Sequence, residues 1–109
     1  MDKQAKEKIL QELGIPEAMY DSLVKEWHVQ ALHACSQLSA AIARNDYEAI
    51  ASIAHTIKGA AANLRIRTIA DIAGQLEQAS RTQVDTTVLR VQTLELEGLL
   101  KDLLLHEGF

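Results

Sequence analysis

A long, regular spacing of apolar residues between positions 20 and 41 limits most strongly how this chain can fold. Seven apolar residues follow one another at alternating steps of four and three: Tyr20, Val24, Trp27, Ala31, Ala34, Leu38 and Ala41. Such steps place side chains on one face of an α-helix that packs at a shallow angle against other helices. Leu23, Cys35 and Ile42 are expected to widen this face. The stretch therefore predicts one long helix of a bundle.

The rest of the chain also favours helices. It has 109 residues with only one proline and five glycines, so few positions favour a turn. Hydrophobic residues make up 48% of the chain and aromatic residues only 4%, as in aliphatic helical cores. We predict an all-α fold in which residues 16–107 form an up-down-up-down antiparallel four-helix bundle, because short corners join the helices. An additional short N-terminal helix, residues 2–13, lies across one end, and residues 1–109 form a single domain.

Capping residues set the predicted helix boundaries. Gly14 suits the left-handed position that ends the first helix, and Pro16 suits the first position of the second. Asn45 suits the end of the second helix. The later helices are expected to begin after side-chain acceptors at Asp46, Thr68 and Asp85.

Charge and composition exclude several classes of function. The formal net charge of −4 argues against general nucleic-acid binding. No apolar run approaches 18 residues, so no membrane span is predicted, and a single cysteine, Cys35, allows no internal disulfide. The five glycines are too scattered to form a phosphate-binding loop. His28 and His33 lie five residues apart and do not share a helix face cleanly, so we predict no metal site, and we expect no cofactor in this chain. The single cysteine and the lack of a predicted membrane span favour a cytoplasmic location.

The stretch from position 50 to 64 carries the candidate site. Apolar residues at helical spacing form its core face: Ile50, Ile53, Ile57, Ala61 and Leu64. His55 points about 160° away from this face, so it should be exposed to solvent. The small residues Ala51, Gly59 and Ala62 should surround it, and Lys58 follows one turn later. A histidine on such a low surface is open to a large partner.

Plainer interpretations exist for each of these residues. An exposed histidine is usually an ordinary surface residue, and Lys58 alone is a solvated charge. Glu77 precedes Arg81 by four residues, so a simple ion pair within one helix is an alternative for it. Gly59 is, on the plain interpretation, a mild helix defect, and Cys35 a small buried hydrophobe.

The segment His55-Thr56-Ile57-Lys58-Gly59-Ala60-Ala61 resembles the signature of histidine-containing phosphotransfer (HPt) domains, His-x-(Leu/Ile)-Lys-Gly-small-small. The resemblance implies a helical bundle whose exposed histidine accepts a phosphoryl group from the aspartate of a response-regulator receiver domain, or from a histidine kinase, and passes it to another regulator. It makes His55 the phosphoacceptor, Lys58 the charge partner of the phosphoryl group, and Glu77 the residue that orients His55. Many members have glycines seven and ten residues after the histidine, where this chain has Ala62 and Arg65.

The chemistry of these side chains agrees with that role. An imidazole whose Nδ1–H is held by a carboxylate presents the lone pair of Nε2 as a nucleophile. Phosphoryl transfer mainly needs in-line positioning and charge neutralisation, which Lys58 supplies in part. The Mg²⁺ is expected on the partner receiver. The protein is then a phosphocarrier without kinase activity of its own.

The surface around His55 should suit an acidic partner. Between Glu48 and Asp71 the chain has no acidic residue but three cations, at Lys58, Arg65 and Arg67. We predict a receiver docking surface formed by Gly59, Ala51, Ala62 and Arg65, on a monomer. The alternatives are the phosphoacceptor domain of a larger chemotaxis-type or hybrid sensor kinase, and an interaction module that is not phosphorylated. The initial Met1 and the N-terminal helix favour a stand-alone protein.

Overall fold

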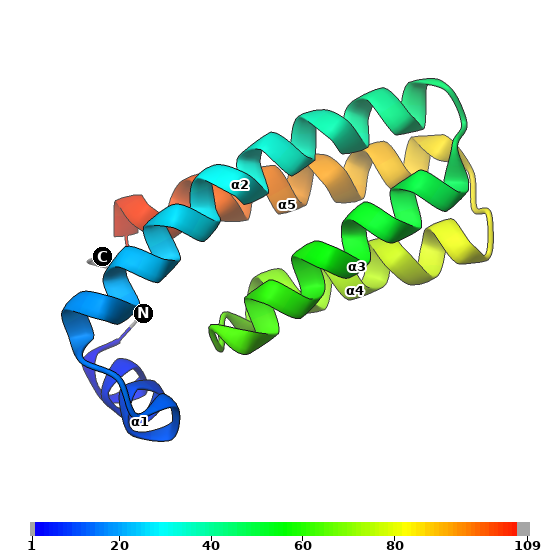
Figure 1. Ribbon diagram of the computed structural model, residues 1–109. Coiled ribbons are helices and arrows are strands. Elements are labelled where there is room, and N and C mark those ends of the chain that lie inside the picture. The colour runs from blue at the N-terminus through cyan, green and yellow to red at the C-terminus, as the bar shows by residue number, and fades with distance from the viewer. Residues whose placement is uncertain (1, 107–109) are drawn as a thin grey trace.

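The computed structural model describes residues 2–106 (Figure 1). This part of the chain is all-helical and contains no β-strand, so the predicted all-α class is confirmed. The five helices are α1 (Lys3–Leu13), α2 (Glu17–Ala43), α3 (Tyr47–Asn63), α4 (Arg67–Arg81) and α5 (Thr86–His106). Residue 107, where the bundle was predicted to end, lies outside the described residues.

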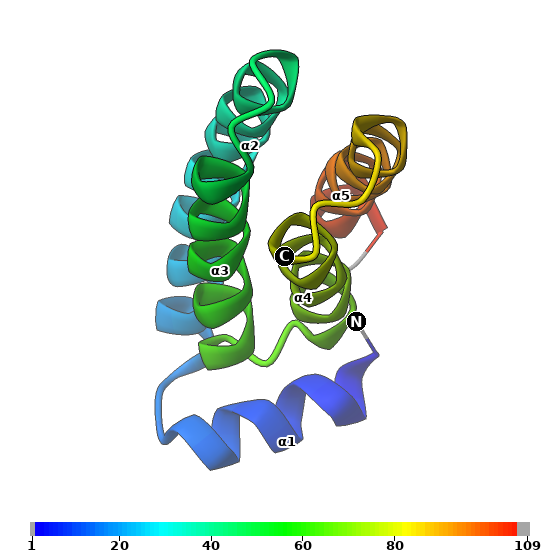
Figure 2. The ribbon, with the colours of Figure 1, turned by 90° about the vertical axis from the view of Figure 1, so that its right-hand side faces the viewer.

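Helices α2 to α5 form an elongated bundle. Each packs against the next one along the chain, and α5 packs back against α2. Successive helices turn back on one another at each corner, and α1 crosses one end of the bundle (Figures 1 and 2). The principal dimensions of the described residues are 42 × 22 × 18 Å. This arrangement holds α3 firmly between two neighbours, α2 and α4.

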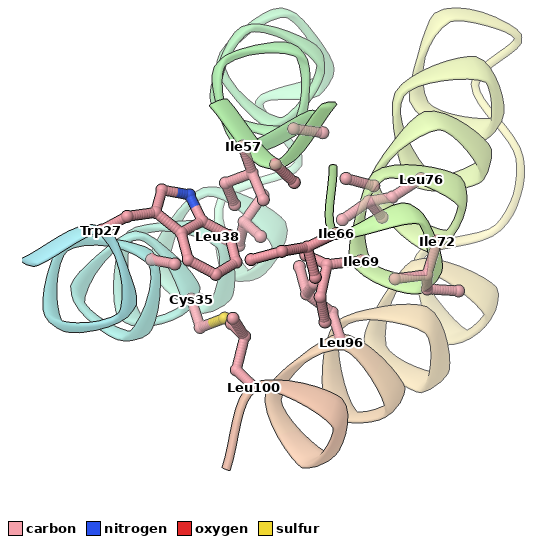
Figure 3. Close-up of a cluster of buried hydrophobic side chains, with 14 of the residues drawn as sticks. Trp27, Cys35, Leu38, Ile57, Ile66, Ile69, Ile72, Leu76, Leu96 and Leu100 are labelled. Carbon is pink, nitrogen blue, oxygen red and sulfur yellow. The ribbon is translucent and has the colours of Figure 1, made fainter. Parts of the chain in front are cut away.

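The core contains the apolar face predicted for α2. Tyr20, Val24, Leu38 and Ala41 are fully buried, whereas Ala34 is half-buried. The α2 side chains point towards apolar residues of α3, of the corner before α4, and of α5 (Figure 3), with labelled examples at Trp27, Leu38, Ile57, Ile66, Leu96 and Leu100. The expectation for Leu23 is wrong, because its side chain is 40% exposed at the edge of the face.

Each of the three corners between α2 and α5 contains one residue with positive φ: Asn45, Arg65 and Gln83. Asn45 was predicted for this role, and Gly14 likewise ends α1 at a φ of 66°. A tyrosine hydroxyl donates to a carbonyl at two of the corners, Tyr20 to Leu64 at 2.6 Å and Tyr47 to Val84 at 3.0 Å. These two hydrogen bonds tie the corners before and after α4 to a neighbouring helix.

Two of the three predicted side-chain caps are present. The Asp46 carboxylate accepts from the Ala49 N–H at 3.1 Å, and Asp85 accepts from the Thr87 N–H at 2.8 Å. The prediction for Thr68 is wrong, because α4 begins at Arg67 after Ile66. Ile66 takes the cap position since its side chain is needed in the core, where it is 3% exposed. Pro16 is the N-cap of α2, one position earlier than predicted.

Helix α1 is held on the end of the bundle by ion pairs and by apolar contact. Lys6 is buried and pairs with Glu17 at 3.1 Å and Asp21 at 2.8 Å, both on α2. Arg65, in the corner between α3 and α4, pairs with Glu12 of α1 at 3.2 Å. Apolar side chains of α1, Ile9, Leu10 and Leu13, pack against the core. Helix α1 thus covers the end of the bundle that contains the α3–α4 corner.

Candidate functional site

His55 lies on the side of α3 that faces away from the core. Its side chain is 62% exposed, whereas Ile50, Ala54 and Ile57 of the same helix are at most 3% exposed. The predicted exposure of His55 is therefore confirmed. The ring is nevertheless held on one edge, because its Nδ1 lies 3.1 Å from Oε2 and 3.3 Å from Oε1 of Glu77 on α4.

Glu77 is an ionised carboxylate with little contact to solvent. Its side chain is only 9% exposed. Hydrogen bonds from Lys58 and Arg81 outweigh the effect of burial and lower the pKa of Glu77 from 4.5 to about 2. An ionised carboxylate only accepts hydrogen bonds, so Nδ1 of His55 must be the donor. In the neutral ring, Nε2 is then unprotonated, on the opposite edge from Glu77.

Lys58 joins α3 to α4 at the same carboxylate. Its Nζ lies 2.8 Å from Oε1 of Glu77, and the side chain is 40% exposed. The stem of Lys58 crosses α4 at Gly74, where an added Cβ would lie 3.3 Å from Cδ of the lysine. The missing side chain at Gly74 thus leaves room for Lys58 to reach Glu77.

Arg81 also binds the Glu77 carboxylate, as the ion-pair interpretation of Glu77 predicted. Its Nη2 and Nε lie 2.7 and 3.1 Å from Oε2 of Glu77. The two interpretations of Glu77 were alternatives in the sequence, yet the carboxylate binds His55, Lys58 and Arg81 together. The spacing of four residues between Glu77 and Arg81 was the only available signal for this contact.

A hollow of about 520 Å³ opens beside His55, between the start of α3 and the end of α4. Its lining includes Tyr47, Glu48, Ala51, Ser52, Ser80, Arg81 and Gln83. Ala51 lies in the lining beside His55, but it is itself only 4% exposed. Ala51 shares the lining of this hollow with Ser80 and Arg81 of α4.

The other residues expected around His55 differ in position. Gly59 and Ala62 are exposed, and a Cβ at Gly59 would point into open space. Arg65 is ten residues beyond His55, about 15 Å along the helix direction. Besides pairing with Glu12, its guanidinium donates to the carbonyls of Ala62 and Asn63. Arg65 therefore has a structural role, and its place in a docking surface stays a prediction.

His28 and Cys35, two other potentially reactive side chains considered in the sequence, are buried and have structural roles. His28 is buried, and its Nε2 lies 2.6 Å from the Leu100 carbonyl, which ties α2 to α5. Cys35 is 1% exposed, and burial raises the pKa of its thiol to about 11. Within residues 2–106 no three metal-ligating side chains gather in one place. No helix in that range is long and apolar enough to span a membrane.

A helical bundle that presents a histidine to solvent, with a carboxylate of the next helix on its Nδ1, has the form of a phosphotransfer domain. A comparison with protein-family models gives the same class, because the model for the Hpt domain matches residues 22–105. The chain belongs to the Hpt domain family, whose members carry phosphoryl groups in two-component signalling and interact there with receiver domains and kinases. Searches of curated proteins and of solved structures found no match.

Proposed function

We propose that this chain is a phosphorelay intermediate in which His55 accepts a phosphoryl group from a receiver-domain aspartyl phosphate, or from a partner histidine kinase. His55 then passes the group to another response regulator. The observation that carries the proposal is the contact of 3.1 Å between Nδ1 of His55 and the Glu77 carboxylate, on a ring that is otherwise exposed. This contact leaves Nε2 free to act as the nucleophile.

The proposed transfer forms one bond to phosphorus and breaks one. The Nε2 lone pair attacks phosphorus, the bond between phosphorus and the aspartate oxygen breaks, and the aspartate carboxylate leaves with the electron pair. The ring keeps its Nδ1–H and gains a positive charge, which the Glu77 carboxylate neutralises from 3.1 Å. In onward transfer the ring leaves phosphorus as neutral imidazole, because Nδ1 has kept its proton.

Lys58 is the proposed charge partner of the phosphoryl oxygens. It lies three residues after His55, so both side chains leave the same side of α3. Its ammonium pairs with Glu77 in the unmodified protein, at 2.8 Å, and its 40% exposure leaves it room to turn outward. We propose that the Mg²⁺ which completes charge neutralisation is bound by the receiver domain. We also propose that this chain is a phosphocarrier without kinase activity of its own.

We propose that the receiver docks on the surface around His55. Gly59 and Ala62 are exposed and small, so a broad partner can approach the ring closely. The hollow beside His55, which Ala51 lines, accommodates a side chain from the partner. Arg65 extends the surface towards the α3–α4 corner. We propose that residues 16–107 form the up-down-up-down bundle of a single domain, 1–109, which acts as a cytoplasmic monomer.

The test is phosphoryl transfer from a labelled, phosphorylated receiver domain to the full chain. Wild-type protein should gain acid-labile, alkali-stable label, as expected for phosphohistidine. The variant His55→Gln should gain none. His33→Gln is the matched control, because His33 is also an exposed helical histidine but lies on α2. Equal labelling of His55→Gln and wild type would refute the proposal.

A further inference from the structure

Two cations, Lys58 and Arg81, bind Glu77, and they differ in how freely they can leave it. Lys58 contacts Oε1, at 2.8 Å, from the neighbouring helix. Arg81 contacts Oε2 through both Nη2 and Nε, at 2.7 and 3.1 Å, from one turn further along α4. Nδ1 of His55 lies nearer to Oε2 than to Oε1, at 3.1 against 3.3 Å. The oxygen that Arg81 binds is therefore also the one nearest to the imidazole.

The geometry gives the two cations different freedom. Lys58 stands on α3 with His55, and its single ammonium on a flexible stem can bind either the carboxylate or an incoming phosphoryl group. Arg81 stands on the same helix as Glu77, and its planar guanidinium holds Oε2 with two N–H groups. Lys58 can therefore leave Glu77 for a phosphoryl group, whereas two N–H groups and a shared helix hold Arg81 on the carboxylate.

Loss of Lys58 matters because Glu77 is only 9% exposed. A carboxylate that is removed from water and lacks a cation takes up a proton more readily. The charged or titratable groups within bonding distance of Glu77 are His55 and Lys58 from α3 and Arg81 from α4. Once Lys58 has turned to the phosphoryl group, Arg81 is the cation that remains against this carboxylate.

We propose that Arg81 is a positioning residue that keeps Glu77 ionised and bound to Nδ1–H of His55 while Lys58 serves the phosphoryl group. This inference rests on the proposed function and adds a residue to it. A protonated Glu77 would be a poor acceptor for Nδ1–H and would not balance the positive charge of the phosphorylated ring. Arg81 thus acts on the transfer through Glu77 and does not touch the reacting atoms.

The first test needs no phosphorylation. The variant Lys58→Ala reproduces the departure of Lys58, and the pKa of Glu77 is measured in it by NMR of a ¹³C-labelled carboxyl group during an acid titration. Adding Arg81→Gln to Lys58→Ala should raise that pKa by at least about 1. Adding Lys101→Gln should leave it unchanged, because Lys101 forms a similar exposed pair four residues from Glu97 but lies on α5. An equal Glu77 pKa with and without Arg81 would overturn the inference.

The second test uses transfer. Arg81→Gln alone should slow transfer from a phosphorylated receiver to His55 about fivefold, and the loss should grow as the pH falls towards 5. Arg81→Lys should restore part of the rate, and Lys101→Gln should match wild type. A rate loss for Arg81→Gln that is the same at every pH would contradict a role through Glu77. If wild type takes up no phosphate while the NMR result holds, the proposed function fails and the hold of Arg81 on Glu77 stands.

Discussion

Nδ1 of His55 on α3 and Oε2 of Glu77 on α4 lie 3.1 Å apart, so the packing of two helices determines which nitrogen of the imidazole is free. The contact joins an exposed side chain to a buried carboxylate, 62% against 9% exposed. The exposed ring therefore has a defined tautomer and orientation, which an isolated surface histidine lacks. The proposed reactivity of His55 therefore depends on how α3 and α4 pack.

Removal of the Glu77 carboxylate should slow transfer to His55 without unfolding the protein. Glu77→Ala leaves Nδ1–H without its acceptor, and we expect about a tenfold lower rate of uptake from a phosphorylated receiver. Glu77→Gln keeps an acceptor oxygen but no charge, so its rate should lie between those of Glu77→Ala and wild type. Rates for both variants equal to that of exposed Glu95→Gln, the control, would show that Glu77 has no part in transfer.

Glu77 should also make stability depend on pH in acid. Its pKa is about 2 in the folded protein against an ordinary 4.5. The unfolded state therefore binds the proton first as the pH falls, so the contribution of Glu77 is complete above about pH 4.5 and is lost towards pH 2. Urea unfolding at pH 6 and pH 3 should show a smaller loss of unfolding free energy for Glu77→Gln than for wild type. Identical losses would mean that the carboxylate is not stabilised by folding.

A bulky residue at Gly59 should block docking while the fold stays intact. Gly59 and Gly98 form a matched pair, because both are exposed helical glycines at which a Cβ points into open space. Replacing either by Leu should raise helix propensity by about 1 kcal/mol and leave the melting temperature equal or higher. Only Gly59→Leu should reduce transfer from the receiver. Reduction by Gly98→Leu of the same size would place the docking surface elsewhere.

Cys35 should be unreactive in the folded protein. It is 1% exposed and burial raises the pKa of its thiol to about 11, so the thiolate is scarce at neutral pH and has no access to reagents. A thiol reagent at pH 7.5 should label it only in denaturant, with a labelling midpoint that coincides with loss of helical circular dichroism. Rapid labelling of native protein would contradict the burial of this face of α2.

The helices and most of the core could be predicted because spacing along one helix is a local property. The four-and-three steps from Tyr20 to Ala41 located the buried face of α2 correctly. Leu23 was assigned to the same face but lies at its edge, since its exposure depends on how close the neighbouring helices come. Ile66 displaced Thr68 as the residue before α4 for a similar reason, because burial of the isoleucine outweighed a side-chain cap.

The site could be predicted only in part, because its contacts cross between helices. The exposure of His55 followed from its angle to Ile57 and the rest of the core face. The sequence left Glu77 with two alternative partners, and only the positions of α3 and α4 relative to each other show that one carboxylate binds both. The low exposure of Ala51, 4%, likewise does not follow from spacing within α3 alone.

The position of the phosphoryl group on the protein tests the central claim most directly. Wild-type chain should be phosphorylated by a phosphorylated receiver domain, and its ring nitrogens examined by ³¹P and ¹⁵N NMR under alkaline conditions that preserve phosphohistidine. The structure predicts a single phosphoryl group on Nε2 of His55, with the proton retained on Nδ1 beside Glu77. A phosphoryl group on Nδ1 of His55, or on any other residue, would contradict the account.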